Sequence, residues 1–323
     1  MKGLKLYLSV LFLGLLFDSC VPRLQDSPLE TGEQSITTTD SVRLAVKVAG
    51  KGPVCFFIHG GPGQDYLSFE KMGGANLEEF LTMVYIDQRG SGHSQSAKNY
   101  SLDRMVDDIE DTRKQLDVDK IYLLSHSFGG VLAVNYAKKY PRHIYGLILA
   151  NSTLHFFNNS SLRGQIGYAY HLLHKDTTIT GDNTASLLQQ NMAVRKQLSK
   201  IRLGYKLLAD SVATIIKMDS IEESYKRNTD FGYAIIAHLI DSTTQNRYPE
   251  YWKDYAPISS QINVPVLVIT GTRDYAIGVD HYKTFKFPNQ QMVNIDGAHM
   301  LYYEKNKAFI ATVKAFIEKR YNN

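Results

Sequence analysis

The stretch Leu123-Leu124-Ser125-His126-Ser127-Phe128-Gly129-Gly130 decides how this chain folds. The apolar run Ile121–Leu124 predicts a buried strand, and Val131–Lys139 predicts a helix directly after it. Ser127 therefore lies at the tip of a tight strand–turn–helix connection, where a serine hydroxyl is held out from the sheet edge. This context predicts that Ser127 is a nucleophile.

The residues two positions away from Ser127 must be small, because the backbone at the tip of this turn is tightly bent. Gly129 meets that requirement, while Ser125 stands where the pattern G-x-S-x-G has its first glycine. Serine is the next smallest practical residue, so the match is weakened and not lost. Gly130 would let the following helix pack closely on the sheet.

Two further residues complete a candidate catalytic triad. Asp274 follows the predicted strand Val264–Thr270, and His299 lies just beyond the predicted strand Gln291–Ile295. The order Ser, Asp, His along the chain is the one that this strand–turn–serine arrangement requires. We therefore expect Asp274 to orient His299, and His299 to act as the general base for Ser127.

Other carboxylates could replace Asp274 as the acid. The strand after the Ser127 helix, Ile144–Ala150, is another place for the acid, but it ends in Asn151-Ser152, which has no carboxylate. Asp274 is therefore preferred, with Asp280 and Asp296 as the alternatives.

A glycine-rich segment, His59-Gly60-Gly61-Pro62-Gly63, follows the apolar run Val54–Ile58. Glycines let backbone N–H groups approach a developing oxyanion without a Cβ in the way. The position after a buried strand is where an oxyanion loop is expected. We predict that the N–H groups of Gly61 and Phe128 form the oxyanion hole.

The rest of the chain predicts an α/β fold with one inserted segment. Short apolar runs alternate with helical stretches, which favours a mostly parallel sheet with helices on both faces. This alternation stops between residues 154 and 255, where only helical patterns occur. We predict a core formed by residues 35–153 and 256–323, with a helical cap at 154–255.

The N-terminus predicts export and attachment to a membrane. Lys2 and Lys5 precede the apolar run Leu6–Phe17, and Asp18-Ser19 then leads to Cys20. A basic start and a short apolar run are typical of a secretory signal. A small residue before a cysteine resembles the site at which bacterial lipoproteins are cleaved and lipidated. We expect residues 1–20 to be such a signal ending at lipidated Cys20, and residues 21–34 to be a polar tether.

Composition excludes some classes of function. The chain has 323 residues, a net charge of +4 and 44% hydrophobic residues, as in an ordinary core-forming protein. The charge is too small and too evenly spread to predict nucleic-acid binding, and no zinc-ligand spacing is present. The only cysteine besides Cys20 is Cys55, in an apolar run, which predicts a buried, inert thiol.

These residues together resemble the proline iminopeptidase family of the α/β-hydrolase superfamily. The resemblance rests on His59–Gly63, on Asp87-Gln88-Arg89-Gly90-Ser91-Gly92-His93-Ser94, and on the spacing of the three triad residues. It implies the α/β-hydrolase fold and the removal of an N-terminal residue, often proline, from short peptides without metal or cofactor.

The predicted cap departs from this family, whose members carry a tryptophan–glutamate cluster that holds the substrate's ammonium group. Here the only tryptophan is Trp252, with no Trp-Glu pair. Binding an ammonium group still requires a carboxylate in a partly dry pocket. Glu222, Glu223 and Asp230 are the candidates in the cap, although such residues are by default solvated.

Three functions remain open from the sequence. The first is an exported aminopeptidase acting on proline or another small N-terminal residue. The second is a carboxylesterase or lactonase that uses the same triad on an ester substrate. The third is a catalytically silent binding lipoprotein, against which the complete triad and glycine-rich loop argue, since function depends on the site and not on the fold.

Overall fold

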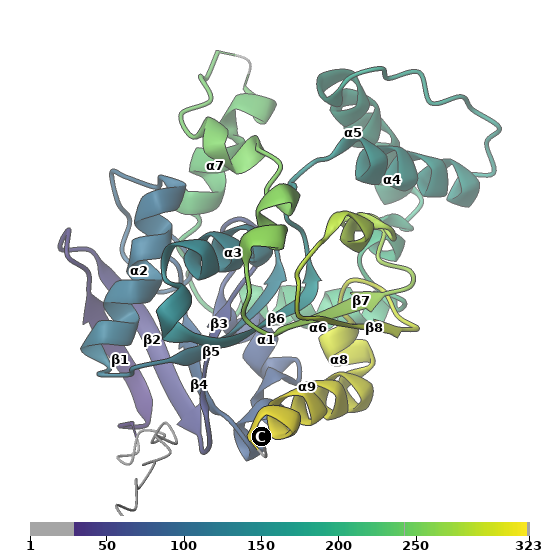
Figure 1. Ribbon diagram of the computed structural model, residues 1–323. Coiled ribbons are helices and arrows are strands. Elements are labelled where there is room, and N and C mark those ends of the chain that lie inside the picture. The colour runs from purple at the N-terminus through teal and green to yellow at the C-terminus, as the bar shows by residue number, and fades with distance from the viewer. Residues whose placement is uncertain (1–28, 242, 322–323) are drawn as a thin grey trace, which may run out of the picture.

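The computed structural model describes residues 29–241 and 243–321 (Figure 1). The predicted signal segment, Cys20 and most of the predicted tether lie outside this range. Within it, no helix combines the length and the hydropathy that crossing a membrane requires.

The described residues form a single eight-stranded sheet in the order β1-β2-β4-β3-β5-β6-β7-β8. The strands are β1 (Gly32–Thr37), β2 (Arg43–Gly50), β3 (Val54–Ile58), β4 (Thr82–Ile86), β5 (Ile121–Ser127), β6 (Ile144–Ser152), β7 (Val266–Gly271) and β8 (Gln290–Ile295). Strand β2 is antiparallel to both of its neighbours, and the other pairs are parallel. The predicted mostly parallel sheet is confirmed, but β1 begins three residues before the predicted core boundary at 35, because residues 32–34 pair with β2.

Helices cover both faces of this sheet (Figure 1). They are α1 (Tyr66–Lys71), α2 (Leu102–Gln115), α3 (Gly129–Lys139), α4 (Asn159–Leu172), α5 (Thr184–Lys200), α6 (Val212–Glu222), α7 (Asp230–Ile240), α8 (Leu301–Glu304) and α9 (Asn306–Tyr321). Helices α2 and α3 pack on one face, and α1 and α9 pack on the other.

The two faces arise from the alternation of side chains along buried strands. Phe56 and Leu123 join the apolar cluster under α2 and α3, while their neighbours Phe57 and Leu124 join the cluster under α1 and α9. A strand whose side chains are buried on both faces reads as a continuous apolar run. Helix α2 begins where Ser101 caps it, by accepting a hydrogen bond from the N–H of Arg104.

The segment between β6 and β7 contains helices α4 to α7, and its parts join different cores. Helices α4 and α5 share a separate apolar cluster with Leu207, and they project beyond the sheet (Figure 1). Ile221 of α6 packs into the cluster on the α1–α9 face, whereas Phe231 and Ile235 of α7 pack into the α2–α3 face. The carboxyl ends of β3, β5, β6, β7 and β8 carry the residues that form the candidate site.

Candidate active site

Ser127 is the last residue of β5, and its backbone is in the left-handed region, with φ of 54°. This conformation requires small neighbours. A Cβ on Gly129 would lie 2.4 Å from the Ile58 carbonyl oxygen, and one on Gly130 would lie 2.6 Å from that of Thr153. The tight turn expected at Ser127 is therefore present. Gly129 and Gly130 are both required in this turn, because a side chain at either position would clash with a backbone oxygen.

The departure at Ser125 is accommodated by a partner on the neighbouring strand. Ser125 is fully buried, and its Oγ lies 2.9 Å from Oγ of Ser152 in β6. The Ser152 hydroxyl donates to the Ser125 carbonyl oxygen at 2.9 Å, which leaves Ser125 as the donor to Ser152. The extra hydroxyl therefore introduces no unpaired polar group in the core.

His299 and Asp274 are held together at the ends of two neighbouring strands. Nδ1 of His299 lies 2.9 Å from Oδ2 of Asp274, whose side chain is fully buried. The other carboxylate oxygen of Asp274 accepts hydrogen bonds from the N–H groups of Ala276 and Ile277. Because the carboxylate accepts from Nδ1–H, the neutral ring of His299 keeps a free lone pair on Nε2. The structure does not bring Asp280 or Asp296 to His299 in this way.

Asn151, at the end of β6, bonds to the segments that carry Asp274 and His299. Its Nδ2 donates to the carbonyl oxygens of Ala298 and His299 at 2.9 and 3.0 Å, and its Oδ1 accepts from the Gly271 N–H at 2.8 Å. Three strand ends are thus joined through one buried amide. Nothing in the sequence indicates this role of Asn151 beyond the absence of a carboxylate at the end of the strand.

His126, the residue before Ser127, lies against His299. Its ring centroid is 4.5 Å from that of His299, and its Nε2 lies 3.2 Å from the His299 carbonyl oxygen. Burial lowers the pKa of His126 to about 3. It therefore stays neutral at physiological pH and adds no positive charge beside His299.

The glycine-rich loop after β3 lies next to Ser127. A Cβ on Gly60 would come within 2.7 Å of the Ser127 Cβ, so this glycine allows the close approach. The ring of His59 accepts a hydrogen bond from the Gln88 N–H at 3.0 Å, and Gln88 Nε2 donates to the His59 carbonyl oxygen. Gly61, with φ of 111°, continues the loop along the cavity wall.

Ser127 and His299 both face one cavity of about 180 Å³. One wall is apolar and includes Phe57, Met218 and Tyr302, while the other carries the glycine-rich loop and the Asp65 side chain. This is enough room for one small residue of a substrate, with its carbonyl at Ser127.

The three acids suggested in the inserted segment lie in different environments. Glu222 is partly buried, burial raises its pKa, and it pairs with Arg227 at 2.7 Å. Arg227 in turn approaches Asp65, which lines the cavity. Glu223 and Asp230 are exposed and do not line the cavity. The structure thus brings Glu222, and not the other two, near the candidate site.

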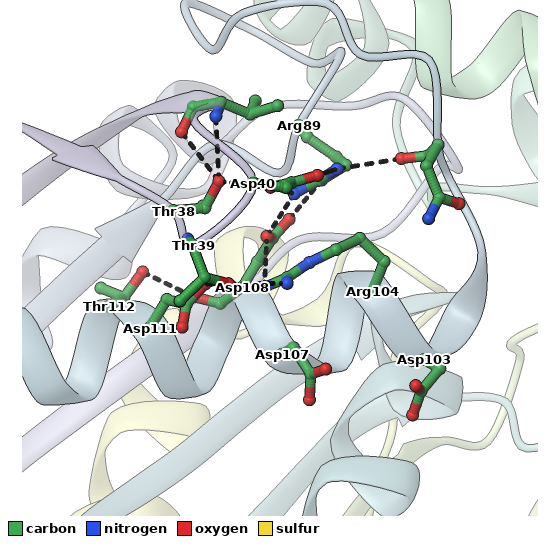
Figure 2. Close-up of polar contacts among 12 residues, drawn as sticks. Thr38, Thr39, Asp40, Arg89, Asp103, Arg104, Asp107, Asp108, Asp111 and Thr112 are labelled. Carbon is green, nitrogen blue, oxygen red and sulfur yellow. Dashed lines mark hydrogen bonds and ion pairs between the residues drawn. The ribbon is translucent and has the colours of Figure 1, made fainter.

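The segment Asp87–Ser94 is hydrogen-bonded to His59 in the glycine-rich loop and to Tyr66 at the start of α1. Asp87 accepts hydrogen bonds from the N–H groups of Tyr66 and His93. Figure 2 shows the buried Arg89 guanidinium between Asp40 and Asp108. The loop is therefore bonded within itself through Asp87, which also accepts from the Ser94 hydroxyl, and to other segments through Arg89. Residues 29–241 and 243–321 contain no group of three His, Cys, Asp or Glu side chains arranged to hold a metal.

Comparisons with known proteins agree with this geometry. The sequence profile described as alpha/beta hydrolase fold matches residues 53–306. A proline iminopeptidase of Saccharolobus solfataricus is 26% identical over 311 residues, covering 91% of this chain and 94% of that protein.

Two solved structures share the fold. A proline iminopeptidase-related protein from Thermus thermophilus has a TM-score of 0.68 at 21% identity, over 90% of this chain and 98% of that one. An esterase from Exiguobacterium antarcticum has a TM-score of 0.61 at 16% identity, over 90% of this chain and 100% of that one. The chain belongs to the alpha/beta hydrolase fold family and, within it, is similar to the proline iminopeptidases.

Proposed function

We propose that this protein is a serine hydrolase in which Ser127, His299 and Asp274 act as a triad. The His299–Asp274 hydrogen bond of 2.9 Å, at the cavity that Ser127 also lines, carries this proposal. Ser127 Oγ attacks a substrate carbonyl while His299 Nε2 removes its proton. Asp274 keeps His299 in the required tautomer and stabilises its cation.

The negative oxygen formed in this step needs hydrogen-bond donors. The N–H groups of Gly61 and Phe128 are the proposed donors, each typically worth about 3 kcal/mol in the transition state. His299 then protonates the leaving group, and a water molecule attacks the acyl-enzyme by the reverse of the same steps. The acyl group leaves as a carboxylic acid, and Ser127 regains its proton.

We further propose that the substrate is a peptide from which one small N-terminal residue, such as proline, is released. The similarity to proline iminopeptidases over nearly the whole chain supports this substrate class. The small cavity, with an apolar wall beside Ser127, fits one compact apolar side chain. Export and lipid attachment at Cys20 stay predictions from the sequence.

The alternative is a carboxylesterase or lactonase with the same triad. The fold similarity to an esterase keeps this alternative open, because related sites on one fold serve different substrates. A binding protein without activity is the least favoured alternative, since the His299–Asp274 hydrogen bond and the left-handed backbone at Ser127 support a catalytic role.

The test compares the wild-type protein with Ser127→Ala on two substrates, prolyl-naphthylamide with a free amine and a short-chain p-nitrophenyl ester. We expect the amide to be cleaved in preference, with acetylation of its amine abolishing cleavage. Ser127→Ala should lose activity on both substrates by a factor of about 10⁴ or more. Equal melting temperatures of the two proteins are the control for folding.

Each other outcome selects a different function. Turnover of the ester alone would keep the triad and replace the aminopeptidase by an esterase. Activity that survives in Ser127→Ala would contradict the triad itself. A wild-type protein that hydrolyses neither substrate and does not react with a fluorophosphonate would favour the silent binding protein.

A further inference from the structure

A hydrogen bond from helix α4 reaches the loop that directly follows Asp274. Gln165 of α4 is buried, and its Nε2 donates to the Ala276 carbonyl oxygen at 2.8 Å. Four residues earlier, on the same face of the helix, the Ser161 hydroxyl donates to the Ile277 carbonyl oxygen. Helix α4 is thus bonded to two successive carbonyl oxygens of this loop.

The residues that accept these bonds also hold the Asp274 carboxylate. The N–H groups of Ala276 and Ile277 donate to Asp274 Oδ1 at 3.1 and 3.3 Å, while Oδ2 lies against His299. The Ala276 C=O and the Ile277 N–H belong to one planar trans peptide unit, in which they point in opposite directions. Gln165 therefore holds one end of this rigid unit, and Asp274 accepts from the other.

Helix α5 fixes the orientation of the Gln165 amide. Gln165 Oε1 accepts from Asn191 Nδ2 at 3.0 Å and from Arg195 Nη2 at 2.7 Å. Since an arginine side chain only donates hydrogen bonds, Oε1 must face α5 and Nε2 must face the loop. Arg195 Nε also donates to Asn191 Oδ1 at 2.8 Å, which closes the network. These side chains of α5 thus direct the Gln165 donor toward Ala276.

An aromatic contact also joins α4 to this loop. The ring of Tyr168 in α4 stacks on that of Tyr275, with centroids 3.7 Å apart and planes 5° apart. Tyr275 directly follows Asp274 and packs against the apolar cluster that α4 and α5 share. The close contact continues at Gly278, where a Cβ would lie only 2.4 Å from Ser161 Oγ. The loop from 275 to 278 is therefore in contact with α4 along its length.

We propose that Gln165 is a positioning residue that holds the acid of the triad through the peptide unit between Ala276 and Ile277. This assignment rests on the proposed function of Asp274 and His299. Gln165 acts through the loop on Asp274, and through Asp274 on His299. Helices α4 and α5, which share an apolar cluster of their own, thereby influence the geometry of a triad carried by the strands of the sheet.

A purely structural role for Gln165, as a link between α4 and α5, makes a different prediction. Gln165→Glu keeps an oxygen that accepts from Asn191, and its charge pairs with the Arg195 guanidinium. The carboxylate has no N–H to donate to the Ala276 carbonyl oxygen, so the bond to the loop is lost. This substitution therefore removes the contact with the loop while it preserves the contact between the two helices.

The experiment measures kcat and KM on prolyl-naphthylamide or p-nitrophenyl acetate, whichever the wild type cleaves faster. We expect kcat of Gln165→Glu to fall about 10- to 100-fold, with KM changed by less than about threefold, because Asp274 no longer holds His299 in place.

The matched control is Gln190→Glu, the same chemical change in α5. Gln190 bonds the Tyr170 hydroxyl of α4 and the backbone of residues 178–181, and not the loop after Asp274. This variant should keep kcat within about twofold of the wild type. Equal losses of kcat in the two variants would overturn the inference, because they would show that any damage to α4 and α5 slows catalysis.

Hydrogen exchange gives a measurement that does not depend on turnover. The N–H groups of Ala276 and Ile277 should exchange at least about tenfold faster in Gln165→Glu than in the wild type, and at the wild-type rate in Gln190→Glu. If Gln165→Glu does not fold, Tyr168→Ala should lower kcat, whereas Tyr168→Phe, which keeps the stacked ring, should not.

The outcomes separate this inference from the function on which it rests. Turnover that depends on Ser127, with an unchanged kcat in Gln165→Glu, would overturn the inference and leave the triad standing. A wild type without such turnover would overturn the proposed function. Faster exchange in Gln165→Glu would then still support the hold of Gln165 on the Asp274 loop, and unchanged exchange would overturn it.

Discussion

Asn151 illustrates how a single buried side chain can organise a site to which it contributes no reacting atom. Its backbone is left-handed, with φ of 42°, a conformation that asparagine tolerates better than most residues. From there its amide reaches the carbonyl oxygens of Ala298 and His299 and the N–H of Gly271. The position of His299 thus depends on a residue 148 positions earlier in the chain.

We predict that Asn151→Gly destabilises the protein and slows catalysis. Glycine adopts the left-handed conformation without strain, so the effect reports the lost hydrogen bonds. Leaving buried main-chain groups unpaired should lower the free energy of unfolding by about 2 kcal/mol or more, and kcat should fall at least about tenfold as His299 loses its support. Urea unfolding and steady-state kinetics measure the two effects.

The control for Asn151→Gly is Asn289→Gly. Asn289 makes one exposed side-chain hydrogen bond, to the Asn263 carbonyl oxygen, and lies just before β8, at the opposite end of that strand from His299. This variant should change the free energy of unfolding by less than about 1 kcal/mol, with unchanged kcat. Equal kinetics of the Asn151 and Asn289 variants would contradict the supporting role.

The residues of the proposed triad could be selected from the sequence because each has a local signal. Ser127, Asp274 and His299 all follow apolar strand patterns, and parallel strands bring their carboxyl ends to one edge. Asn151 has no such signal. An asparagine after a strand is common, and its role arises only from contacts between distant segments.

At the scale of elements, the start of α7 is pressed against the glycine-rich loop. A Cβ on Gly63 would lie 2.7 Å from the Gly232 Cα, and one on Gly232 would lie 2.8 Å from the Pro62 carbonyl oxygen. The same segment is bonded to the core by the Phe231 N–H, which donates to Gly90, and by a backbone bridge between Asn228 and Gly92. Helix α7 is therefore positioned to fix the conformation of the glycine-rich loop, which carries the proposed oxyanion donor Gly61.

We predict that Gly232→Ala lowers kcat at least about tenfold with a smaller change in KM. The added methyl group has only backbone atoms to displace, and a shift of the loop moves the Gly61 N–H away from the oxyanion. Gly164→Ala, in α4, is the matched control, because a Cβ there meets nothing within 4 Å. It should stabilise the helix by up to about 1 kcal/mol without affecting kinetics. Steady-state kinetics of both variants test this prediction. An unchanged kcat in Gly232→Ala would show that the contact between α7 and the glycine-rich loop does not affect catalysis.

The sequence predicted a helical segment between β6 and β7 because strand patterns are missing there. It could not predict how that segment is divided, since α4 and α5 form their own apolar cluster while α6 and α7 join opposite faces of the core. Apolar helix faces alone do not show which partner they meet. The limits of the cap stay a prediction.

At the scale of the whole molecule, Arg89 joins three segments that are distant in sequence (Figure 2). Its guanidinium contacts Asp40 in the turn between β1 and β2, the Asn99 carbonyl oxygen, and Asp108 in α2. Asp108 and Arg89 are both buried. Removing the arginine would leave the buried Asp108 carboxylate with much less compensation, because among the described residues it pairs otherwise only with Arg104.

We predict that Arg89→Met lowers the free energy of unfolding by about 3–5 kcal/mol at neutral pH. Lys139→Met is the control, since Lys139 also bonds α2, through Asp103 and Asp107, but in a partly exposed position. Its loss should cost less than about 1 kcal/mol. Urea unfolding at pH 7 gives both values, and similar losses in the two variants would contradict the importance of burial.

The same pair of proteins, wild type and Arg89→Met, should converge in stability as the pH falls. The Arg89 guanidinium holds the pKa of Asp40 well below its usual range, so the stability from this pair is present above about pH 4 and is lost below it. Burial raises the pKa of Asp108 to about 6, and without Arg89 it should rise further. Protonation of Asp108 then relieves the unpaired charge in the variant, beginning near neutral pH.

Unfolding measured from about pH 7 down to about pH 4 should therefore show a shrinking difference in the free energy of unfolding between the two proteins. A difference that stays constant with pH would mean that the methionine variant is destabilised by packing alone, and not by the carboxylates that Arg89 neutralises.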